Sequence, residues 1–151
     1  MHSEGLHAEE LVLKAPGMGG RWVTDILADH NPDDESYFPY MNGQFVFKNA
    51  VVRFAEVINE GLQANNLQVS DINMLIPHQA NLRISQFIQK KFGLNDDQVF
   101  SNVQRYGNTT AASIPIALTE AWEQGKIKSG DLVVLAAFGS GFTWGSVIIR
   151  W

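Results

Sequence analysis

Two polar side chains, the imidazole of His78 and the carboxamide of Asn108, stand at predicted turns about one βα unit apart. Pro77 precedes the histidine and keeps Ile76 extended, so His78 lies on a rigid corner where a strand stops. Open α/β sheets place their chemistry at such corners. Imidazole and amide N–H groups can donate hydrogen bonds to an oxygen on which negative charge develops.

A glycine-rich stretch from Phe138 to Gly145 could supply further donors. Its glycines permit the positive φ angles that let backbone amides point into a cavity. A plain hairpin turn is the alternative, although Phe142, Thr143 and Trp144 are bulky for that role. A single histidine at a strand end is more often structural than catalytic, but the nearby amide and glycines favour a site. The sequence has no cysteine, so a thiol nucleophile is missing.

Periodicity predicts the elements that would hold these groups. A helix should begin at Met41–Gln44 and end at Asn65-Asn66, and Gly61 should weaken its end. Its apolar residues recur at helical intervals and indicate a buried core stripe, made of Phe47, Val51, Phe54, Ile58 and Leu62.

The corner itself should lie between a strand over Ile72–Ile76 and a second helix over Ala80–Phe92. Gly93 is expected to end that helix. Its inward face is predicted to consist of Ile84, Phe87, Ile88 and Phe92.

Further strands are predicted after the second helix. One covers Gln98–Val103, and two more, Leu132–Phe138 and Ser146–Arg150, should pair antiparallel across the short glycine stretch. A helix is expected between the first of these strands and the other two. Pro115 is tolerated only near the start of a helix, so this helix should begin near Ala111 or later. Asn108 then lies in the turn ahead of the helix.

The first forty residues are predicted to form an irregular N-terminal segment with a short strand, and residues 41–151 the main domain. Met1–Glu10 is polar and is expected to fray, and Leu11–Leu13 should be the strand. The loop Pro16–Gly20 lacks the lysine of a phosphate-binding loop, and Arg21–Tyr40 has no regular pattern.

Composition limits the possible functions. A chain of 151 residues with 45% hydrophobic content can form one domain, and a net charge of −5 argues against general nucleic-acid binding. The absence of cysteine is compatible with a reducing cytoplasm, and we expect a cytoplasmic location. Neither a signal peptide nor a membrane-spanning helix is predicted, and the spacing of His2 and His7 does not predict a metal site.

Three motifs resemble, in order and spacing, the C-terminal half of β-ketoacyl-acyl carrier protein synthase III, a thiolase-like condensing enzyme. They are Pro77–Asn81, Tyr106–Ser113 and Gly139–Gly145. The resemblance runs from about Met41 to Trp151 and is looser before it. It implies an α/β fold in which a thiolase-like half has a mixed five-stranded sheet covered by helices.

The resemblance also implies a reaction. In that family, acyl-CoA acylates a cysteine on the other half, a malonyl thioester on acyl carrier protein is decarboxylated, and the enolate attacks the acyl-enzyme to start fatty acid biosynthesis. His78 and Asn108 match the catalytic residues that donate to the thioester oxygen, and the backbone amide of Ser140 matches the oxyanion position for the acyl-cysteine. No cofactor is expected beyond acyl-CoA and malonyl-carrier protein as substrates.

Other positions match binding residues of the family. Those matching the pantetheine tunnel are Gly43, Phe47, Ala80 and Asn81, and those matching the carrier-docking surface are Lys48 and Arg83. Arg83 and Lys90 are two turns apart on one helix face, with Lys91 beside them. This basic stripe is either an ordinary solvated face or a docking surface for the acidic carrier, and the resemblance favours docking. A homodimer is also expected.

The missing cysteine is the main departure from the family. We interpret the chain as part of a longer enzyme, with no condensing activity alone and an apolar surface where the other half packs. A separate domain without condensing activity is the other interpretation. Alternative functions are a related thiolase-fold synthase for polyketide or hydroxymethylglutaryl products, or a non-catalytic dimerisation or binding module.

Overall fold

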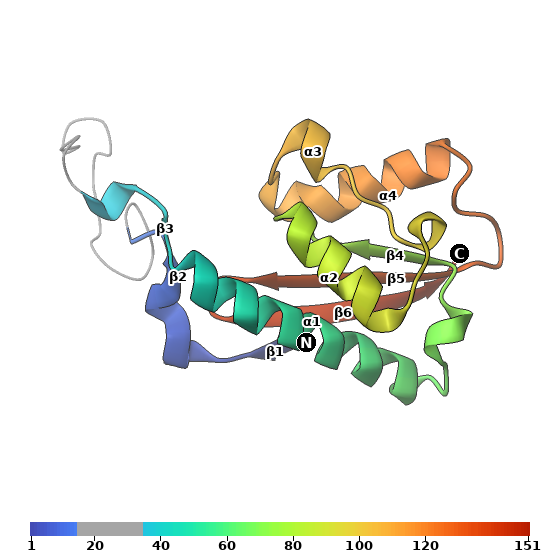
Figure 1. Ribbon diagram of the computed structural model, residues 1–151, viewed down its shortest axis with the longest axis horizontal. Helices are drawn as coiled ribbons and strands as arrows, with labels where there is room; N and C mark the ends of the chain where they lie inside the picture. Colours follow the sequence, from blue (N-terminus) through green and yellow to red (C-terminus); the bar gives the residue numbers. More distant parts are fainter. Residues whose placement is uncertain (15–34) are drawn as a thin grey trace.

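The two long strands β5 (Leu132–Gly139) and β6 (Thr143–Arg150) form the centre of the main sheet in the computed structural model (Figure 1). They pair antiparallel, as predicted. On either side, β4 (Met74–Pro77) runs parallel to β5, and β1 (His2–Ser3) pairs antiparallel with β6. The resulting order β1-β6-β5-β4 is a mixed sheet, as the sequence predicts. The structure describes residues 1–14 and 35–151.

The predicted strand over Gln98–Val103 is wrong, and the main sheet of the described residues has four strands rather than five. A 3-10 helix, η4 (Asp96–Gln98), comes first, followed by one parallel bridge between Leu75 and Val99 and the short helix α3 (Val103–Tyr106). The reason is a side chain: the Gln79 carbonyl accepts the amides of Asn102 and Val103 at 2.9 and 3.2 Å. Those amides cannot then extend a ladder.

Helices cover both faces of the sheet. Alternate residues of β5 from Leu132 to Phe138 share one core cluster with α1 (Gly43–Ala64) and α2 (Leu82–Phe92). Val133, one position out of phase, packs in a second cluster with α4 (Ser113–Glu123). Since successive side chains of a strand point to opposite faces, α4 lies across the sheet from α1 and α2.

The long helix α1 is the one the apolar stripe predicts. The Asn42 side chain caps its start by accepting the Phe45 amide at 3.3 Å, and Asn65 is its C-cap. Gly61 was predicted to weaken the end of this helix, but the structure gives it another role. A Cβ there would lie 2.9 Å from the Ser146 hydroxyl, so the glycine allows α1 to approach β6 closely.

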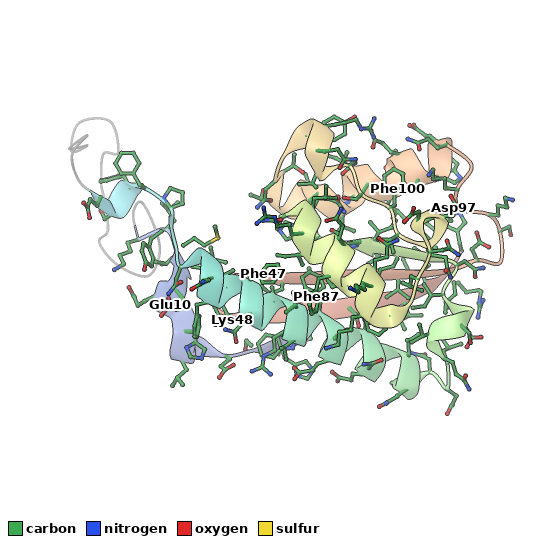
Figure 2. All side chains as sticks on the ribbon, in the orientation of Figure 1. Glu10, Phe47, Lys48, Phe87, Asp97 and Phe100 are labelled. Atoms are coloured by element: carbon green, nitrogen blue, oxygen red, sulfur yellow. The ribbon has the colours of Figure 1, made fainter. Side chains whose placement is uncertain are left out.

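Helix α2 ends as predicted, at Gly93, but it begins at Leu82 rather than at Ala80. Asn81 caps it, and Gly93 ends it at a φ of +65°. Ile84 and Ile88 are buried, but the prediction that Phe87 faces inward is wrong, because 42% of Phe87 is exposed. Its ring instead stands edge-on to that of Phe47 on α1, with centroids 6.2 Å apart (Figure 2).

Helix α4 leaves its face of the sheet partly uncovered. Its start at Ser113, after the 3-10 turn η5 (Thr110–Ala112), agrees with the prediction from Pro115. On this face Val147 of β6 is 55% exposed, and Trp122 of α4 is 56% exposed. The described residues therefore present apolar side chains to solvent beside α4.

The first ten residues are ordered rather than frayed. β1 is followed by the 3-10 helix η1 (Gly5–Glu10), and Glu4 exchanges two backbone hydrogen bonds with Phe142, of 2.7 and 2.6 Å. β2 (Leu11–Val12), the predicted short strand, pairs with β3 (Tyr40–Met41) in a separate two-stranded sheet. The remaining 3-10 helices are η2 (Glu35–Tyr37) and η3 (Val69–Asp71). The predictions for Pro16–Gly20 and for residues 21–34 lie outside the described residues.

Candidate active site

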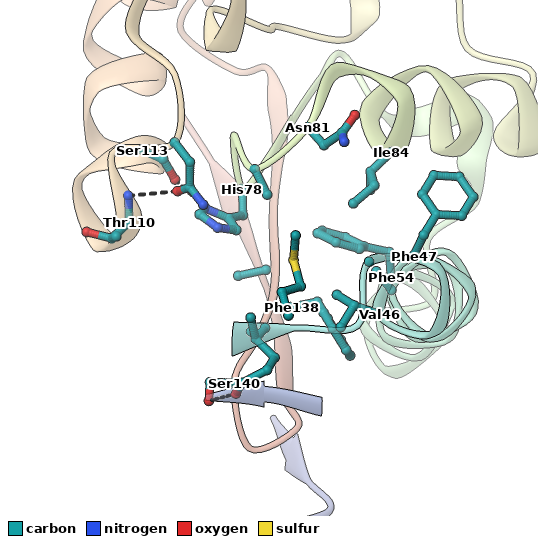
Figure 3. A pocket seen from close by; sticks show the side chains of 18 of the residues that line it. Val46, Phe47, Phe54, His78, Asn81, Ile84, Thr110, Ser113, Phe138 and Ser140 are labelled. Atoms are coloured by element: carbon teal, nitrogen blue, oxygen red, sulfur yellow. Dashed lines mark hydrogen bonds between the residues drawn. The ribbon is translucent and has the colours of Figure 1, made fainter. Parts of the chain in front are cut away.

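A cavity of about 930 Å³ opens where the parallel strands β4 and β5 end (Figure 3). Its walls come from the N-terminal turns of α1 and α2, the turn before α4, the end of β5, and Leu11 and Met41 of the small sheet. The volume is in the range of pockets that hold small-molecule ligands. The carboxyl edge of the parallel pair is the place where the sequence predicts chemistry.

His78 stands at this edge, immediately after β4. Its backbone amide donates to the Ala136 carbonyl at 2.8 Å, and its Nδ1 lies 2.5 Å from the Ser113 hydroxyl. Its Nε2 has no hydrogen-bond partner among the described residues and is available to the cavity that His78 lines. Burial lowers the pKa of the imidazole, because a cation there loses hydration. The lowered pKa favours the uncharged ring at neutral pH.

Gln79 is buried directly behind the histidine. Its amide nitrogen donates to the Pro77 carbonyl at 2.6 Å, and its carbonyl oxygen accepts from the Ser101 hydroxyl at 3.0 Å as well as from the two backbone amides of Asn102 and Val103. Gln79 thereby fastens the corner after β4 to the segment that leads to Asn108. This side chain fixes the relative position of the two predicted turns.

Asn108 is oriented by its own turn. Its side-chain oxygen accepts the Thr110 amide at 2.9 Å, the bond drawn at Thr110 in Figure 3. Thr110 itself adopts a φ of +51°, which is uncommon for a β-branched residue. With the oxygen engaged, the NH₂ group of Asn108 is the end left to donate, and no partner for it occurs among the described residues. Asn108 lines the same cavity as His78.

The segment before Asn108 is fixed to α4 through Glu120. This carboxylate accepts from the Asn102 amide group at 2.8 Å and from Tyr106 and Arg105 at 2.5 Å each. These bonds lower the pKa of Glu120, the Asn102 hydrogen bond most of all, and the same carboxylate raises the pKa of Tyr106. These bonds therefore hold the short helix α3 against α4.

Ser140 brings the glycine stretch to the opposite side of the cavity. Its hydroxyl donates to the Leu11 carbonyl at 2.6 Å, and in the described residues no hydrogen bond satisfies its backbone amide. Gly141 has a φ of +138°, and the Gly141–Phe142 peptide bond is cis. Phe142 is fully buried, which answers the question of why a bulky residue stands in this turn. The segment is a packed loop rather than a plain hairpin turn.

The predicted site residues largely meet at this cavity. Its lining includes His78, Asn108, Ser140, Gly43, Phe47, Ala80, Asn81 and Arg83. Lys48 is not among the lining residues and is exposed on α1, near the start of the helix in Figure 2. Phe47 was predicted both in the core stripe and in the tunnel, and it is half-buried at the cavity wall.

Sequence reasoning gave no role to Ser113 and Gln79, although both lie within the quoted motifs. The signal was their place beside the donors: Gln79 follows His78, and Ser113 begins the helix after Asn108. Leu11 and Met41 also line the cavity, and nothing in their local pattern indicated this.

The polar groups that line the cavity include several possible hydrogen-bond donors. Among the described residues no group of three or more His, Asp or Glu side chains could hold a metal ion. An imidazole, a carboxamide and a backbone amide can together stabilise oxygens on which negative charge develops. In the described part, no helix is both long and apolar enough to cross a membrane.

Comparisons with known proteins point to one family. Residues 62–151 match the family described as "3-Oxoacyl-[acyl-carrier-protein (ACP)] synthase III C terminal". The chain is 50% identical over 139 residues to the β-ketoacyl-[acyl-carrier-protein] synthase III of Salmonella typhimurium strain LT2, and this covers 91% of the chain and 44% of that protein.

Solved structures agree with the sequence relatives. The 3-oxoacyl-[acyl-carrier-protein] synthase III of Aquifex aeolicus superposes with a TM-score of 0.83 at 37% identity, covering 99% of this chain and 42% of that one. The Pseudomonas aeruginosa PAO1 enzyme gives a TM-score of 0.83 at 34% identity, with the same coverage of 99% and 42%. The chain thus spans less than half the length of the relatives that it matches.

Proposed function

The chain belongs to the 3-oxoacyl-[acyl-carrier-protein] synthase III family, within its C-terminal part, and from this premise we propose that its cavity carries out the decarboxylation half of a Claisen condensation. The substrates would be malonyl-acyl carrier protein and an enzyme-bound acyl group derived from acyl-CoA, and the product would initiate fatty acid biosynthesis. The observation that carries the proposal is the joint presence of His78 and Asn108 in the wall of one cavity, each with a side-chain nitrogen that has no partner among the described residues.

In decarboxylation, the bond between the malonyl carboxylate and its α-carbon breaks and CO₂ leaves. The electron pair passes into an enolate whose negative charge rests on the thioester oxygen. His78 donates from Nε2 and Asn108 from its NH₂ group to that oxygen. Both donors are fixed before the reaction, so they need not reorganise as the charge appears. A neutral imidazole suits this role because a cation would be held as a counter-ion to the malonyl carboxylate.

In condensation, the enolate carbon attacks the carbonyl of an acyl-cysteine, and the thiolate leaves after the tetrahedral intermediate collapses. The Ser140 amide, which lacks a partner among the described residues, would bind the oxyanion of that intermediate. The cysteine is not among these 151 residues and would be supplied by a further polypeptide segment. The uncovered apolar side chains beside α4, Val147 and Trp122, suit the packing of such a segment.

The substrate arm and the carrier would approach from α1 and α2. The pantetheine path would be lined by Gly43, Phe47, Ala80 and Asn81, and the acidic carrier would be contacted by Arg83 and Lys48.

Arg83→Ala should weaken carrier binding several-fold. The effect should be larger at low salt, because ions screen exposed charges. Lys128→Ala is the control, since Lys128 lies in the segment just before β5 and so at the opposite end of that strand from the cavity. Equal binding by both variants would remove Arg83 from the docking surface.

The central test is decarboxylation by the chain co-expressed with the N-terminal part of the Salmonella typhimurium relative, which contributes the missing segment. We expect CO₂ release from malonyl-carrier protein, and His78→Ala should reduce it by about 10²–10³ because one preformed donor is lost. Undiminished CO₂ release from the His78 variant, or none from the assembly that contains the unsubstituted chain, would contradict the proposal. A homodimer and a cytoplasmic location stay predictions.

A further inference from the structure

Ser113 makes two hydrogen bonds at the base of the cavity. It is the first residue of α4, and only 2% of its surface is exposed. Its hydroxyl oxygen lies 3.3 Å from the Gln79 backbone nitrogen and 2.5 Å from His78 Nδ1. A backbone amide can only donate, so the hydroxyl is the acceptor in the bond with Gln79.

The remaining question is which partner of the Ser113–His78 pair holds the proton. A hydroxyl carries a single hydrogen. If Nδ1 donated to the hydroxyl, the hydrogen of the hydroxyl itself would need another acceptor, and the described residues provide none. Leaving a buried donor unsatisfied is costly. If the hydroxyl donates to Nδ1, every group in the pair is satisfied. In a neutral imidazole with Nδ1 accepting, the ring proton sits on Nε2.

We propose that Ser113 is a positioning residue that holds His78 in the tautomer with its proton on Nε2, the nitrogen available to the cavity. This inference rests on the proposed function for its purpose, since only that tautomer can donate to a thioester oxygen. The test of this inference is independent of the proposed function, because the tautomer can be observed without any reaction. Ser113 acts through the histidine rather than on substrate.

The chain contains a matched control for the loss of a buried hydroxyl. Ser85 on α2 is as buried as Ser113, with 2% exposed, but its hydroxyl has no hydrogen-bond partner. It does not line the cavity. Ser85→Ala therefore removes the same atoms from an equally buried site without touching His78.

The experiment is ¹⁵N NMR of the chain with labelled histidine at pH 8, where a neutral ring distinguishes a protonated from an unprotonated nitrogen by chemical shift. The His78 signals are assigned by their absence in His78→Gln. In the native chain we expect Nδ1 unprotonated and Nε2 protonated. In Ser113→Ala the ratio of the two tautomers should fall roughly two- to tenfold, as expected for the loss of one neutral hydrogen bond. Ser85→Ala should match the native ratio.

Two results would overturn the inference: a native His78 with its proton on Nδ1, or a Ser113→Ala ratio equal to the native one. The first does not need Ser113→Ala, so the inference stays testable even if that variant fails to fold. Decarboxylation by the assembled enzyme separates the two proposals. An unreactive native protein whose His78 tautomer still depends on Ser113 would refute the proposed function and leave the positioning role intact. With activity present, Ser113→Ala should lower the rate in proportion to the lost fraction of the Nε2-protonated tautomer, which is a smaller change than the change in the tautomer ratio.

Discussion

The two donors of the cavity are held in different ways. His78 depends on groups from elsewhere in the chain: the Ala136 carbonyl of β5 and the Ser113 hydroxyl of α4. Asn108 depends on the Thr110 amide, two residues further along. The difference follows from their chemistry. An imidazole has two nitrogens and can change its charge, so remote contacts must select its state. An amide cannot titrate, and a local turn is enough to select its donating end.

The first prediction separates the donor of Asn108 from its turn and has the largest expected effect. Asn108→Asp keeps an oxygen for the Thr110 amide but replaces the NH₂ group with a second oxygen. Decarboxylation by the assembled enzyme should fall by about 10²–10³ because a donor is lost. The free energy of unfolding should change by no more than about 0.5 kcal/mol at this exposed position. A large loss of stability would show that the turn depends on more than this oxygen.

The second prediction removes the remote support of the corner. Gln79→Leu is similar in size but leaves the buried amides of Asn102 and Val103 without their acceptor. We expect the free energy of unfolding to fall by about 3 kcal/mol, measured by urea denaturation. Gln104→Leu, at an exposed position of the same segment, is the control and should stay within about 0.5 kcal/mol of the native chain. Similar values for the two variants would mean that Gln79 does not support the corner.

The third prediction uses the charge that only one donor can acquire. Burial lowers the pKa of His78 below that of the unfolded histidine, so the unfolded chain takes up this proton first as the pH falls. The contribution to stability is complete above the unfolded pKa and is lost as the pH falls from there to the lower folded value. His78→Gln should therefore lose part of the decrease in stability seen between pH 8 and pH 5. Asn108→Ala should keep it, and identical pH profiles for native and His78→Gln would contradict the stated shift.

The fourth prediction concerns the backbone of the local turn and is the smallest. Thr110 has a φ of +51°, whereas Thr109 has a φ of −92°. Thr110→Gly relieves an unfavourable conformation, which roughly offsets the entropy that glycine adds to the unfolded chain, so stability should change by less than about 1 kcal/mol. Thr109→Gly gains no such relief and should be the less stable variant by urea denaturation. The reverse order would place the strain elsewhere in the turn.

Much of the fold could be predicted because its signals are local. The stripe on α1, the glycine that ends α2 and the proline near the start of α4 act within a few residues of where they stand. The predicted strand over Gln98–Val103 failed because a side chain more than twenty residues away, that of Gln79, accepts two of its amides. The position of Phe87 was predicted wrongly because helical spacing does not distinguish a buried residue from one at the margin of the buried face. At that margin the Phe87 ring contacts the ring of Phe47.

The site was predictable for a different reason. His78, Asn108 and Ser140 stand in motifs whose resemblance to a family indicated their roles, whereas residues 1–14 carry no such motif. The structure nevertheless puts Leu11 in the cavity wall and pairs Glu4 with Phe142. Pairings between the two ends of a chain leave no periodic pattern in either end. The place of Ser113 after Asn108 could draw attention to it, but its contact with His78, 35 positions away, leaves no pattern in the sequence.

The bond from the Ser140 hydroxyl to the Leu11 carbonyl joins residues 129 positions apart. During synthesis on the ribosome, the Leu11 carbonyl therefore lacks this partner until Ser140 has emerged. Long-range pairings of this kind are slow to close and leave strand edges exposed meanwhile. The rim of the cavity is thus expected to be the last part to form and the first to open under mild denaturation, while the helices around it are still intact.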